Sequence, residues 1–339
     1  MTAKELYIRA INKKNPARVP CICPGGMMNM ISGEIQDRAD TYWPEAHSDA
    51  AKMAKLASCP YELGILDNIG VPFCMTVEAE ALGAAVDMGS KLVEPIVSAY
   101  AMDSVSEWKK LPALDPEKGR AKVVLDSLGI IKKTHPQAVV MGNLTGPISL
   151  ATSLMDAESF YKELRKKPAD AGDFLSFLSE QLVSFGKAQI EAGADFITIA
   201  DPSGTGEILG PVLFERFALP YINHIASELR PLCSGVTVHI CGRLQPIYRF
   251  IESIESDVIS VDSVVPLTQL REHSGGKAIM GNVSTVALAG SSETVVRSNA
   301  RHCLESRVNI LAPACGLGTS TSISNLSVLM ESSKEASNV

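Results

Sequence analysis

Two residues that can bind metals lie two positions apart in the segment VTVHICG, residues 236–242. Its β-branched residues predict a strand, in which side chains at positions i and i+2 point to the same side. His239 and Cys241 should therefore project together from the end of this strand. The pair alone leaves two interpretations open: part of a metal site, or a buried histidine beside an ordinary buried thiol.

A third candidate ligand, Cys315, follows an apolar run in the segment LAPACGLG, residues 311–318. One nitrogen and two sulfur ligands suit zinc, and a catalytic zinc site keeps a fourth position open. Metal binding becomes the favoured interpretation if both strands end at the same edge of one sheet. Asp262 ends the next apolar run, where it could be a fourth ligand, could orient His239, or could accept hydrogen bonds from the backbone.

Short apolar runs that end in small or polar residues alternate with helical patterns along the chain. The helical pattern is clearest over residues 173–193, where apolar residues recur at helical spacing up to Gly193. Eight such runs predict an α/β fold of the (β/α)8 TIM-type barrel, with a doubly wound open sheet as the alternative. The runs span residues 18–25, 61–73, 138–147, 194–204, 235–242, 257–266, 277–285 and 308–318.

Other polar residues fall where catalytic groups of such a barrel are found, at the C-terminal ends of strands. Asp201 and Glu80 could bind polar groups of a substrate or accept its proton, and Asn143 and Asn282 could bind the substrate. For Asp201 and Glu80, structural hydrogen bonding is an alternative with at least equal support, and the two asparagines are weaker candidates of the same kind.

The segment after the first apolar run contains no charged residue. Gly25 and Gly26 would let a flat ligand approach the backbone, and Met27 and Met28 could line an adaptable apolar wall or simply fill the core. The region 26–60 departs from the alternation and predicts a cap or lid. No linker interrupts residues 1–339, which predicts a single domain.

The overall composition excludes several classes of function. The net charge is −7 and no basic cluster occurs, which argues against a nucleic-acid partner. No run of eighteen apolar residues and no signal-type segment occurs, which favours a cytoplasmic protein that has no membrane partner. Eight cysteines in such a protein are expected to be free thiols rather than a disulfide framework.

Several segments together resemble one family. The sequence is similar to the zinc-dependent corrinoid methyltransferases of the uroporphyrinogen decarboxylase superfamily, and within them to the methylcobamide:coenzyme M methyltransferases. The segments that carry the resemblance are RVPCICPGGMMNM (18–30), TVEAEALGA (76–84), NLTGPISLA (143–151), IADPSGTGEILGP (199–211), HICG (239–242), MGNVST (280–285) and CGLGT (315–319).

The resemblance implies a distorted barrel in which zinc is held by His239, Cys241 and Cys315. It also implies a separate corrinoid protein, carrying methylcobamide (a cobalamin-type cofactor), that docks at the barrel mouth. The expected reaction moves a methyl group from the corrinoid to a small thiol such as coenzyme M. The reverse direction, from a methyl ether, methyl halide or methylated thiol to the corrinoid, is the alternative.

One departure from the superfamily bears on function. The decarboxylases carry arginines after the first strand, which hold the carboxylates of the tetrapyrrole, whereas residues 23–30 here read CPGGMMNM. Decarboxylation is therefore disfavoured. A non-catalytic cobamide-binding protein is a third hypothesis, and the intact set of three metal-binding residues argues against it.

Overall fold

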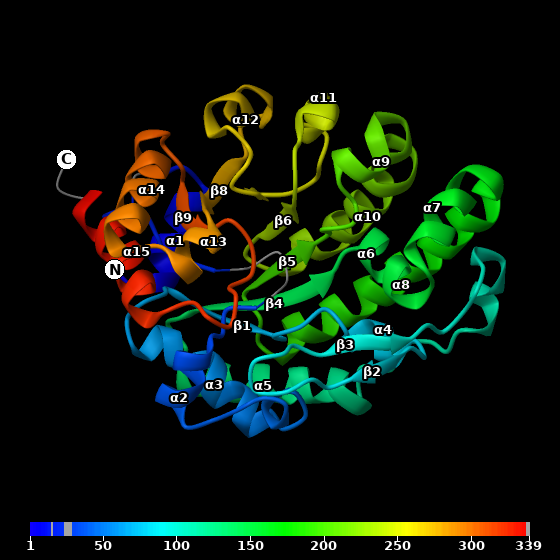
Figure 1. The fold of residues 1–339 in the computed structure, drawn as a ribbon, viewed down its shortest axis with the longest axis horizontal. Helices are drawn as coiled ribbons and strands as arrows, with labels where there is room; N and C mark the ends of the chain where they lie inside the picture. The colour runs from blue at the N-terminus through cyan, green and yellow to red at the C-terminus, as the bar shows by residue number, and fades with distance from the viewer. Residues whose placement is uncertain (15, 24–28, 337–339) are drawn as a thin grey trace.

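Seven parallel strands form one curled sheet at the centre of the molecule (Figure 1). The structure is a computed structural model that describes residues 1–14, 16–23 and 29–336. Every strand pairs in parallel with its neighbours, in the order β1-β4-β5-β6-β7-β8-β9, and the arrangement is consistent with a TIM-type barrel. The strands are β1 (Asn68–Val71), β4 (Val139–Thr145), β5 (Phe196–Ala200), β6 (Val236–Ile240), β7 (Val258–Val261), β8 (Ala278–Val283) and β9 (Ile310–Pro313).

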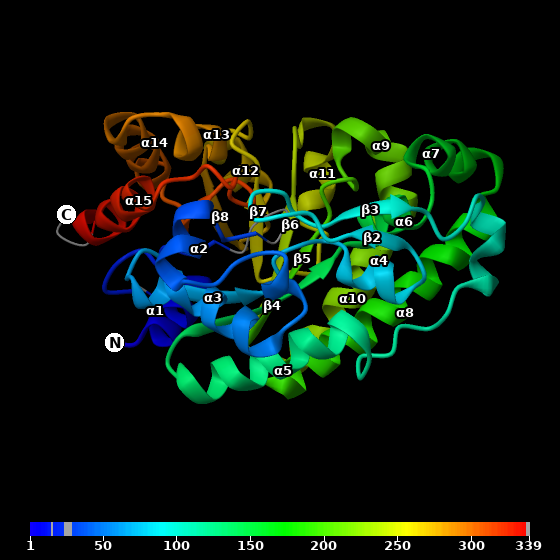
Figure 2. The ribbon, with the colours of Figure 1, turned by 60° about the horizontal axis from the view of Figure 1, so that its bottom comes forward.

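Helices cover the outside of the sheet, as Figures 1 and 2 show from two directions. A separate antiparallel pair, β2 (Ala85–Asp87) and β3 (Ile96–Ala99), lies between β1 and α5 in the chain. The helices are α1 (Ala3–Ile11), α2 (Gly33–Ala39), α3 (Ala50–Glu62), α4 (Val77–Ala81), α5 (Gly119–Thr134), α6 (Pro147–Leu154), α7 (Ala157–Lys166), α8 (Pro168–Ala192), α9 (Gly206–Leu213), α10 (Leu219–Leu229), α11 (Tyr248–Ile251), α12 (Leu267–His273), α13 (Thr285–Gly290), α14 (Glu293–Glu305) and α15 (Ile323–Glu335).

Six of the eight predicted strand segments contain β4 to β9, and the segment 61–73 contains β1 near its end. The helix predicted over residues 173–193 is part of α8, which begins earlier, at Pro168, and ends before Gly193. Gly193 has a φ of 129°, a backbone conformation that glycine adopts without strain.

The prediction of a strand over residues 18–25 is wrong for residues 18–23, the part of this range that the structure describes. Only a single bridge joins Cys21 to Leu311 of β9. Pro20 has no N–H group, and the N–H of Cys21 donates to the Asp67 carboxylate, 2.8 Å away, instead of to a neighbouring strand. A regular ladder therefore cannot extend through this segment.

Residues 20–22 nevertheless lie between the two edge strands of the sheet. The Ile22 N–H donates to the Leu311 carbonyl (3.1 Å), and the Leu311 N–H donates to the Pro20 carbonyl (2.9 Å). On the other side, the N–H of Asp67, just before β1, donates to the Cys21 carbonyl (2.8 Å). This short segment thus connects β9 to the start of β1.

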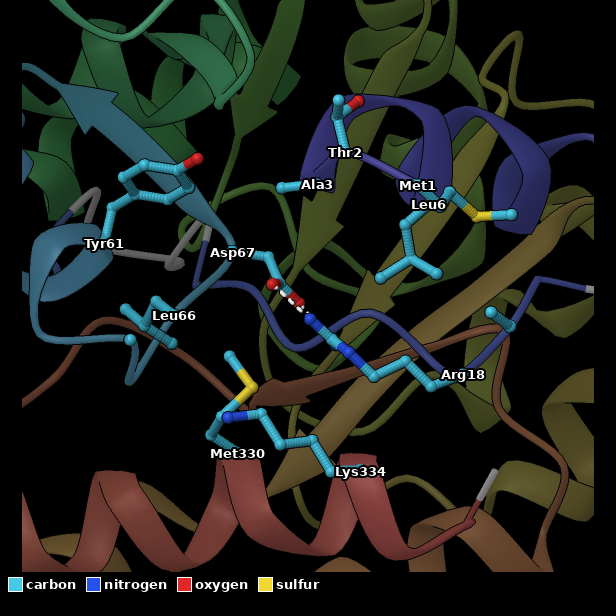
Figure 3. Close-up of a pocket in the computed structure, with 12 residues that line it drawn as sticks. Met1, Thr2, Ala3, Leu6, Arg18, Tyr61, Leu66, Asp67, Met330 and Lys334 are labelled. Atoms are coloured by element: carbon cyan, nitrogen blue, oxygen red, sulfur yellow. Dashed lines mark hydrogen bonds and ion pairs between the residues drawn. The ribbon is translucent and has the colours of Figure 1, made fainter. Parts of the chain in front are cut away.

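An ion pair fixes the connecting segment at the N-terminal edge of the strands. Figure 3 shows the Asp67 carboxylate facing the Arg18 guanidinium beside a cavity of about 530 Å³. Two charge-assisted bonds join them, Nη2–Oδ1 at 2.6 Å and Nη1–Oδ2 at 2.7 Å. Because Asp67 is buried and also accepts from the Cys21 N–H, the carboxylate ties residues 18–21 to β1.

The interior of the sheet is apolar toward the N-terminal ends of the strands. Tyr7 of α1 packs edge-on against Phe196, with ring centroids 4.8 Å apart, and its hydroxyl lies 3.4 Å from the Thr237 hydroxyl. Buried residues of five strands and of the connecting segment make up this cluster, among them Ile22, Val139, Met141, Val258, Met280 and Ile310. The polar residues of the same strands lie further along, toward the C-terminal ends.

Three further expectations concern the chain as a whole. None of the eight cysteines, all of which are described, is in a disulfide, as expected. Among the described residues, no helix combines the length and the apolar character that a membrane span requires. The helix α3 packs against α5 and β1, in the outer layer. The cap over residues 26–60 stays a prediction, and residues 26–28 lie outside the described part of the chain.

Replacing Asp67 by Asn should destabilise the fold. Arg18 would keep its charge without a carboxylate partner, and breaking a buried pair in this way costs about 3 kcal/mol. Urea unfolding followed by circular dichroism measures the loss. Asp126→Asn, which alters an exposed pair with Lys122, is the matched control and should change stability little. Equal effects of the two substitutions would contradict the role given to Asp67.

Candidate metal centre

Three predicted ligands meet at the C-terminal edge of the sheet. The His239 Nε2 atom lies 3.0 Å from the Cys241 Sγ atom, which lies 3.7 Å from the Cys315 Sγ atom. One ligand atom from each residue can be chosen so that all three lie within 4.8 Å of one another. Ligand atoms around tetrahedral zinc are separated by roughly 3.3–3.8 Å, given metal–ligand distances of about 2.0–2.3 Å. The three side chains therefore fit a zinc ion with little movement.

The elements explain this convergence. His239 is in β6 and Cys241 follows that strand directly, while Cys315 lies two residues beyond β9. The chain turns sharply at Gly242, whose φ of 69° favours glycine, and a Cβ atom there would lie 2.5 Å from the Glu207 carboxylate. His239 is fully buried, whereas both cysteines are partly accessible.

The two thiols shift each other's pKa in opposite directions. The pKa of the Cys315 thiol is lowered, chiefly because the Cys241 thiol donates a hydrogen bond to it and also because His239 lies close. The same bond, together with burial, raises the pKa of Cys241. One sulfur therefore ionises readily. Ionising the second would place two negative charges side by side, and a bound cation would offset their repulsion.

Ser260 sets the orientation of the imidazole. Its hydroxyl lies 2.9 Å from His239 Nδ1, and the two residues face each other on the paired strands β6 and β7. When a metal ion is bound, Nδ1 would donate to this hydroxyl and leave Nε2 to bind the ion beside the sulfurs. Orienting His239 was one of the three predicted roles of Asp262, and Ser260 was not predicted. The available signal was the position of Ser260, two residues before Asp262 and therefore on the same side of β7.

Asp262 makes its hydrogen bonds elsewhere. Its carboxylate accepts from the backbone N–H of Gly242 (3.2 Å) and of Val264 (3.1 Å), and from the Ser263 hydroxyl (3.2 Å). Of the three interpretations of Asp262, satisfaction by backbone donors is the one that these contacts support. Asp262 is not in the group of three ligand residues, and its catalytic role stays a prediction.

Asp201 is fully buried beneath the N-terminus of α6. Its carboxylate accepts from the Ser149 hydroxyl (2.6 Å) and from the backbone N–H groups of Ser149 (2.8 Å) and Ile148 (3.2 Å). Burial raises the pKa of Asp201 in spite of these bonds. The contacts suit a residue that joins β5 to α6, so the structural alternative accounts for them, and the proposed catalytic role stays a prediction.

Glu80 is paired with a buried arginine. Its carboxylate accepts from Arg120 Nε at 2.5 Å. The neighbouring acid Glu78 is the one that reaches the end of β4, where it accepts from the Thr145 N–H (2.9 Å) and hydroxyl (3.1 Å). The sequence analysis selected Glu80 and missed Glu78, because the short helix α4 gives no pattern that distinguishes the two.

The predicted substrate-binding residues have different surroundings. Asn282 donates to the carbonyls of Asp262 (2.8 Å) and Val265 (3.0 Å), and so holds the loop after β7. The Asn143 Oδ1 atom is buried with no hydrogen-bond partner among the described residues, and the same holds for the hydroxyl of its strand neighbour Thr198. An unsatisfied buried oxygen suits a ligand or water contact, but substrate binding stays a prediction for both asparagines. Gly25, Gly26, Met27 and Met28 lie outside the described residues.

A carboxyl group that the sequence analysis missed lies near the centre. Glu94, in the loop between β2 and β3, accepts a hydrogen bond from Asn29 Nδ2 at 3.1 Å. The pKa of Glu94 is raised to about 7, chiefly by burial and in smaller part by the charge of Cys315. The hairpin that carries Glu94 stands outside the alternation of strands and helices, so no sequence pattern indicated this position.

Replacing Ser260 by Ala should weaken metal binding by about 10–100-fold, because the imidazole loses the bond that fixes its orientation. Competition with a chromogenic zinc chelator measures this affinity. Ser260→Thr keeps the hydroxyl and should restore most of the affinity. Ser263→Ala is the control, on the loop that follows β7, and should leave the affinity unchanged. An equal effect of Ser260→Ala and Ser263→Ala would disprove the positioning role.

The raised pKa of Glu94 predicts a pH dependence of stability. The folded protein keeps the Glu94 proton up to about pH 7, whereas the unfolded chain loses it near pH 4.5. Stability should therefore fall as the pH rises through this window and change no further from this group above it. Glu94→Gln keeps the Asn29 contact and removes the ionisation.

Urea unfolding of the metal-free protein at about pH 5 and about pH 8 tests this expectation. Glu94→Gln should lose less stability between the two conditions than the unaltered protein. Glu158→Gln, at an exposed glutamate paired with Lys162, should behave like the unaltered protein. Parallel behaviour of all three proteins would contradict the effect assigned to Glu94.

Comparison with known proteins identifies the family of this chain. The model of the family described as Uroporphyrinogen decarboxylase (URO-D) matches residues 2–336. The chain is 30% identical over 336 residues to a methylcobamide:CoM methyltransferase of Methanosarcina acetivorans, covering 98% of each chain. It is 27% identical over 332 residues to a methylated-thiol–coenzyme M methyltransferase of Methanosarcina mazei, covering 96% of this chain and 88% of that protein.

A solved structure gives the same relationship. A methyltransferase from Methanosarcina mazei superimposes with a TM-score of 0.91 at 29% sequence identity, covering 99% of both chains. The similarity therefore extends over both the sequence and the arrangement of the elements. The chain belongs to the uroporphyrinogen decarboxylase (URO-D) family, as its sequence segments predicted.

Proposed function

We propose that this protein is a zinc-dependent methyltransferase that moves a methyl group between a corrinoid held by a partner protein and a small thiol, with coenzyme M as the leading acceptor. The convergence of His239, Cys241 and Cys315 at the C-terminal edge of the sheet carries the proposal. Relatives named as methylcobamide:CoM methyltransferases, similar over 98% of the chain, support it.

The proposed ligands have distinct tasks. His239 presents Nε2 because Ser260 binds Nδ1, and the two cysteines present their sulfurs from separate strand ends. When bound, zinc would lower the pKa of a coordinated substrate thiol, so that the thiol loses its proton near neutral pH. Two cysteine ligands carry negative charge, which keeps the sulfur of the substrate electron-rich. Gly242 and the bonds of Asp262 to the backbone hold the Cys241 loop in place.

The direction of transfer has a second candidate. One relative is named as a methylated-thiol–coenzyme M methyltransferase, which favours removal of a methyl group from a methylated thiol. The same ligand set serves that direction, because a cation that stabilises a thiolate also stabilises it as a leaving group. Decarboxylation of a tetrapyrrole is disfavoured, since the segment 23–30 carries no cation that could bind carboxylates.

The remaining expectations belong to the same proposal. We propose that residues 1–339 work as one domain, in the cytoplasm, with the corrinoid protein as partner and without nucleic acid. The acidic net charge of −7 supports the last point, because binding to phosphate groups depends on basic residues.

Metal analysis and a methyl-transfer assay test the proposal together. The purified protein should contain about one zinc per chain. Cys241→Ser and Cys315→Ser should lose the metal and lower methyl transfer from methylcobalamin to coenzyme M by at least about 100-fold. Cys59→Ser, at a buried free thiol on α3, is the control and should keep both. Absorption of the cobalt centre and mass spectrometry of the thiol product give the rates.

Each alternative predicts a different result in these assays. Full activity of metal-free protein would contradict a zinc enzyme. Turnover of uroporphyrinogen without metal would indicate a decarboxylase. Tight binding of the corrinoid without transfer to or from any thiol would indicate a binding protein.

A further inference from the structure

Large apolar side chains are exposed mainly at one edge of the molecule. Of the thirteen such side chains exposed among the described residues, eight lie on connections that leave the C-terminal ends of strands. In a parallel α/β sheet these connections share one edge, which is also the edge of the candidate metal centre. The eight are Leu92, Val93, Ile96 and Tyr100 between β1 and α5, Ile208 and Val212 on α9, Val264 after β7, and Val286 on α13.

The highest concentration is on the hairpin of residues 85–100, here called the docking arm. Leu92, Val93, Ile96 and Tyr100 each expose 50–56% of their surface. The arm consists of β2, β3 and the loop between them, and it is not part of the seven-stranded sheet. In Figure 2 the cyan hairpin reaches from the neighbourhood of α4 toward the loop that follows β9.

The inner side of the docking arm contacts the metal-centre loop. Thr319 donates from its hydroxyl to the Leu92 carbonyl at 3.2 Å. Asn29 donates both to Glu94 of the arm (3.1 Å) and to the carbonyl of Leu317 (2.8 Å), two residues after Cys315. The arm is therefore fixed beside Cys315 on one side, while its apolar side chains face outward.

The proposed reaction requires a partner at this edge. A methyl group that passes directly between cobalt and sulfur requires the reacting atoms to approach to about 3–3.5 Å. A corrin carried by another protein can come so close to the metal centre only if that protein covers the surrounding surface. The apolar groups beside the centre would then be removed from water, which favours association.

We infer that the docking arm is a docking site for the corrinoid protein, with Leu92, Val93 and Ile96 packed against an apolar face around its corrin. This inference rests on the proposed function. The charges of the arm support an apolar partner face: it contains only Asp87, Lys91 and Glu94, and Lys91 is paired with Asp37 of α2. Association through the arm should accordingly depend little on salt.

The double variant Leu92→Ser/Ile96→Ser tests the inference. With the corrinoid protein purified from the source cells by its cobalt absorption and loaded with methyl groups, kcat/KM should fall by at least about tenfold. With free methylcobalamin the rate should match that of the unaltered protein, which also shows that the variant is folded. The matched control is Leu232→Ser, which alters a side chain that is 52% exposed just before β6, at the opposite edge of the sheet.

A binding measurement separates docking from catalysis. The dissociation constant for the same corrinoid protein, measured by biolayer interferometry, should rise by at least about tenfold in the double variant and not in Leu232→Ser. A photo-reactive residue placed at Val93 should cross-link to the corrinoid protein.

Other outcomes overturn the inference. If the double variant matches the unaltered protein in both binding and turnover of the loaded corrinoid protein, the arm is not the docking site, while methyl transfer from free methylcobalamin leaves the proposed function intact. If light scattering shows that the double variant loses self-association instead, the arm is a contact between copies of this chain. If the unaltered protein transfers methyl groups with neither donor, the proposed function fails and the inference fails with it.

Discussion

Two cysteine sulfurs 3.7 Å apart, with an imidazole nitrogen 3.0 Å from one of them, impose the main electrostatic constraint on this molecule. Two thiolates at that distance repel strongly in a partly buried site, so only one of the sulfurs ionises readily by itself. A bound cation removes the conflict and makes both sulfurs ligands. This arrangement of side chains is therefore better suited to binding a cation than to filling the core.

The rest of the fold holds these atoms at the ends of separate strands. Parallel pairing of β6 with β7 places Ser260 opposite His239 and so controls one imidazole nitrogen, while β9 brings Cys315 from 74 residues away in the chain. The other end of the sheet is fixed by different interactions, the Tyr7 packing and the Arg18–Asp67 ion pair. The ion pair and the Tyr7 packing thus lie at the N-terminal edge, and the candidate metal centre lies at the C-terminal edge, where TIM-type barrels carry their catalytic groups.

Much of this could be predicted from the sequence. β-branched runs with period-two geometry predicted β4 to β9, and the shared edge of parallel strands predicted that His239, Cys241 and Cys315 would meet. The misses have physical causes. Residues 20–22 contact both edge strands without a ladder, because Pro20 lacks a donor and Asp67 takes the Cys21 N–H. Glu94 acts through a contact between distant segments, which no local pattern encodes, whereas the position of Ser260, two residues before Asp262, was a signal that went unused. The contact of the Asp201 carboxylate with the N-terminus of α6 was not indicated by the sequence pattern either.

A family that contains decarboxylases as well as methyltransferases must vary its chemistry on a conserved scaffold. The segment 23–30 contains no charged residue and hence no cation for an anionic tetrapyrrole, while two cysteines and a histidine offer a place for a soft cation. The hairpin beside Cys315 adds exposed apolar surface where a decarboxylase of a small diffusible substrate would need none. A site that must receive its methyl group from another protein needs such a surface, because the donor cannot reach the sulfur unless the two proteins exclude water together.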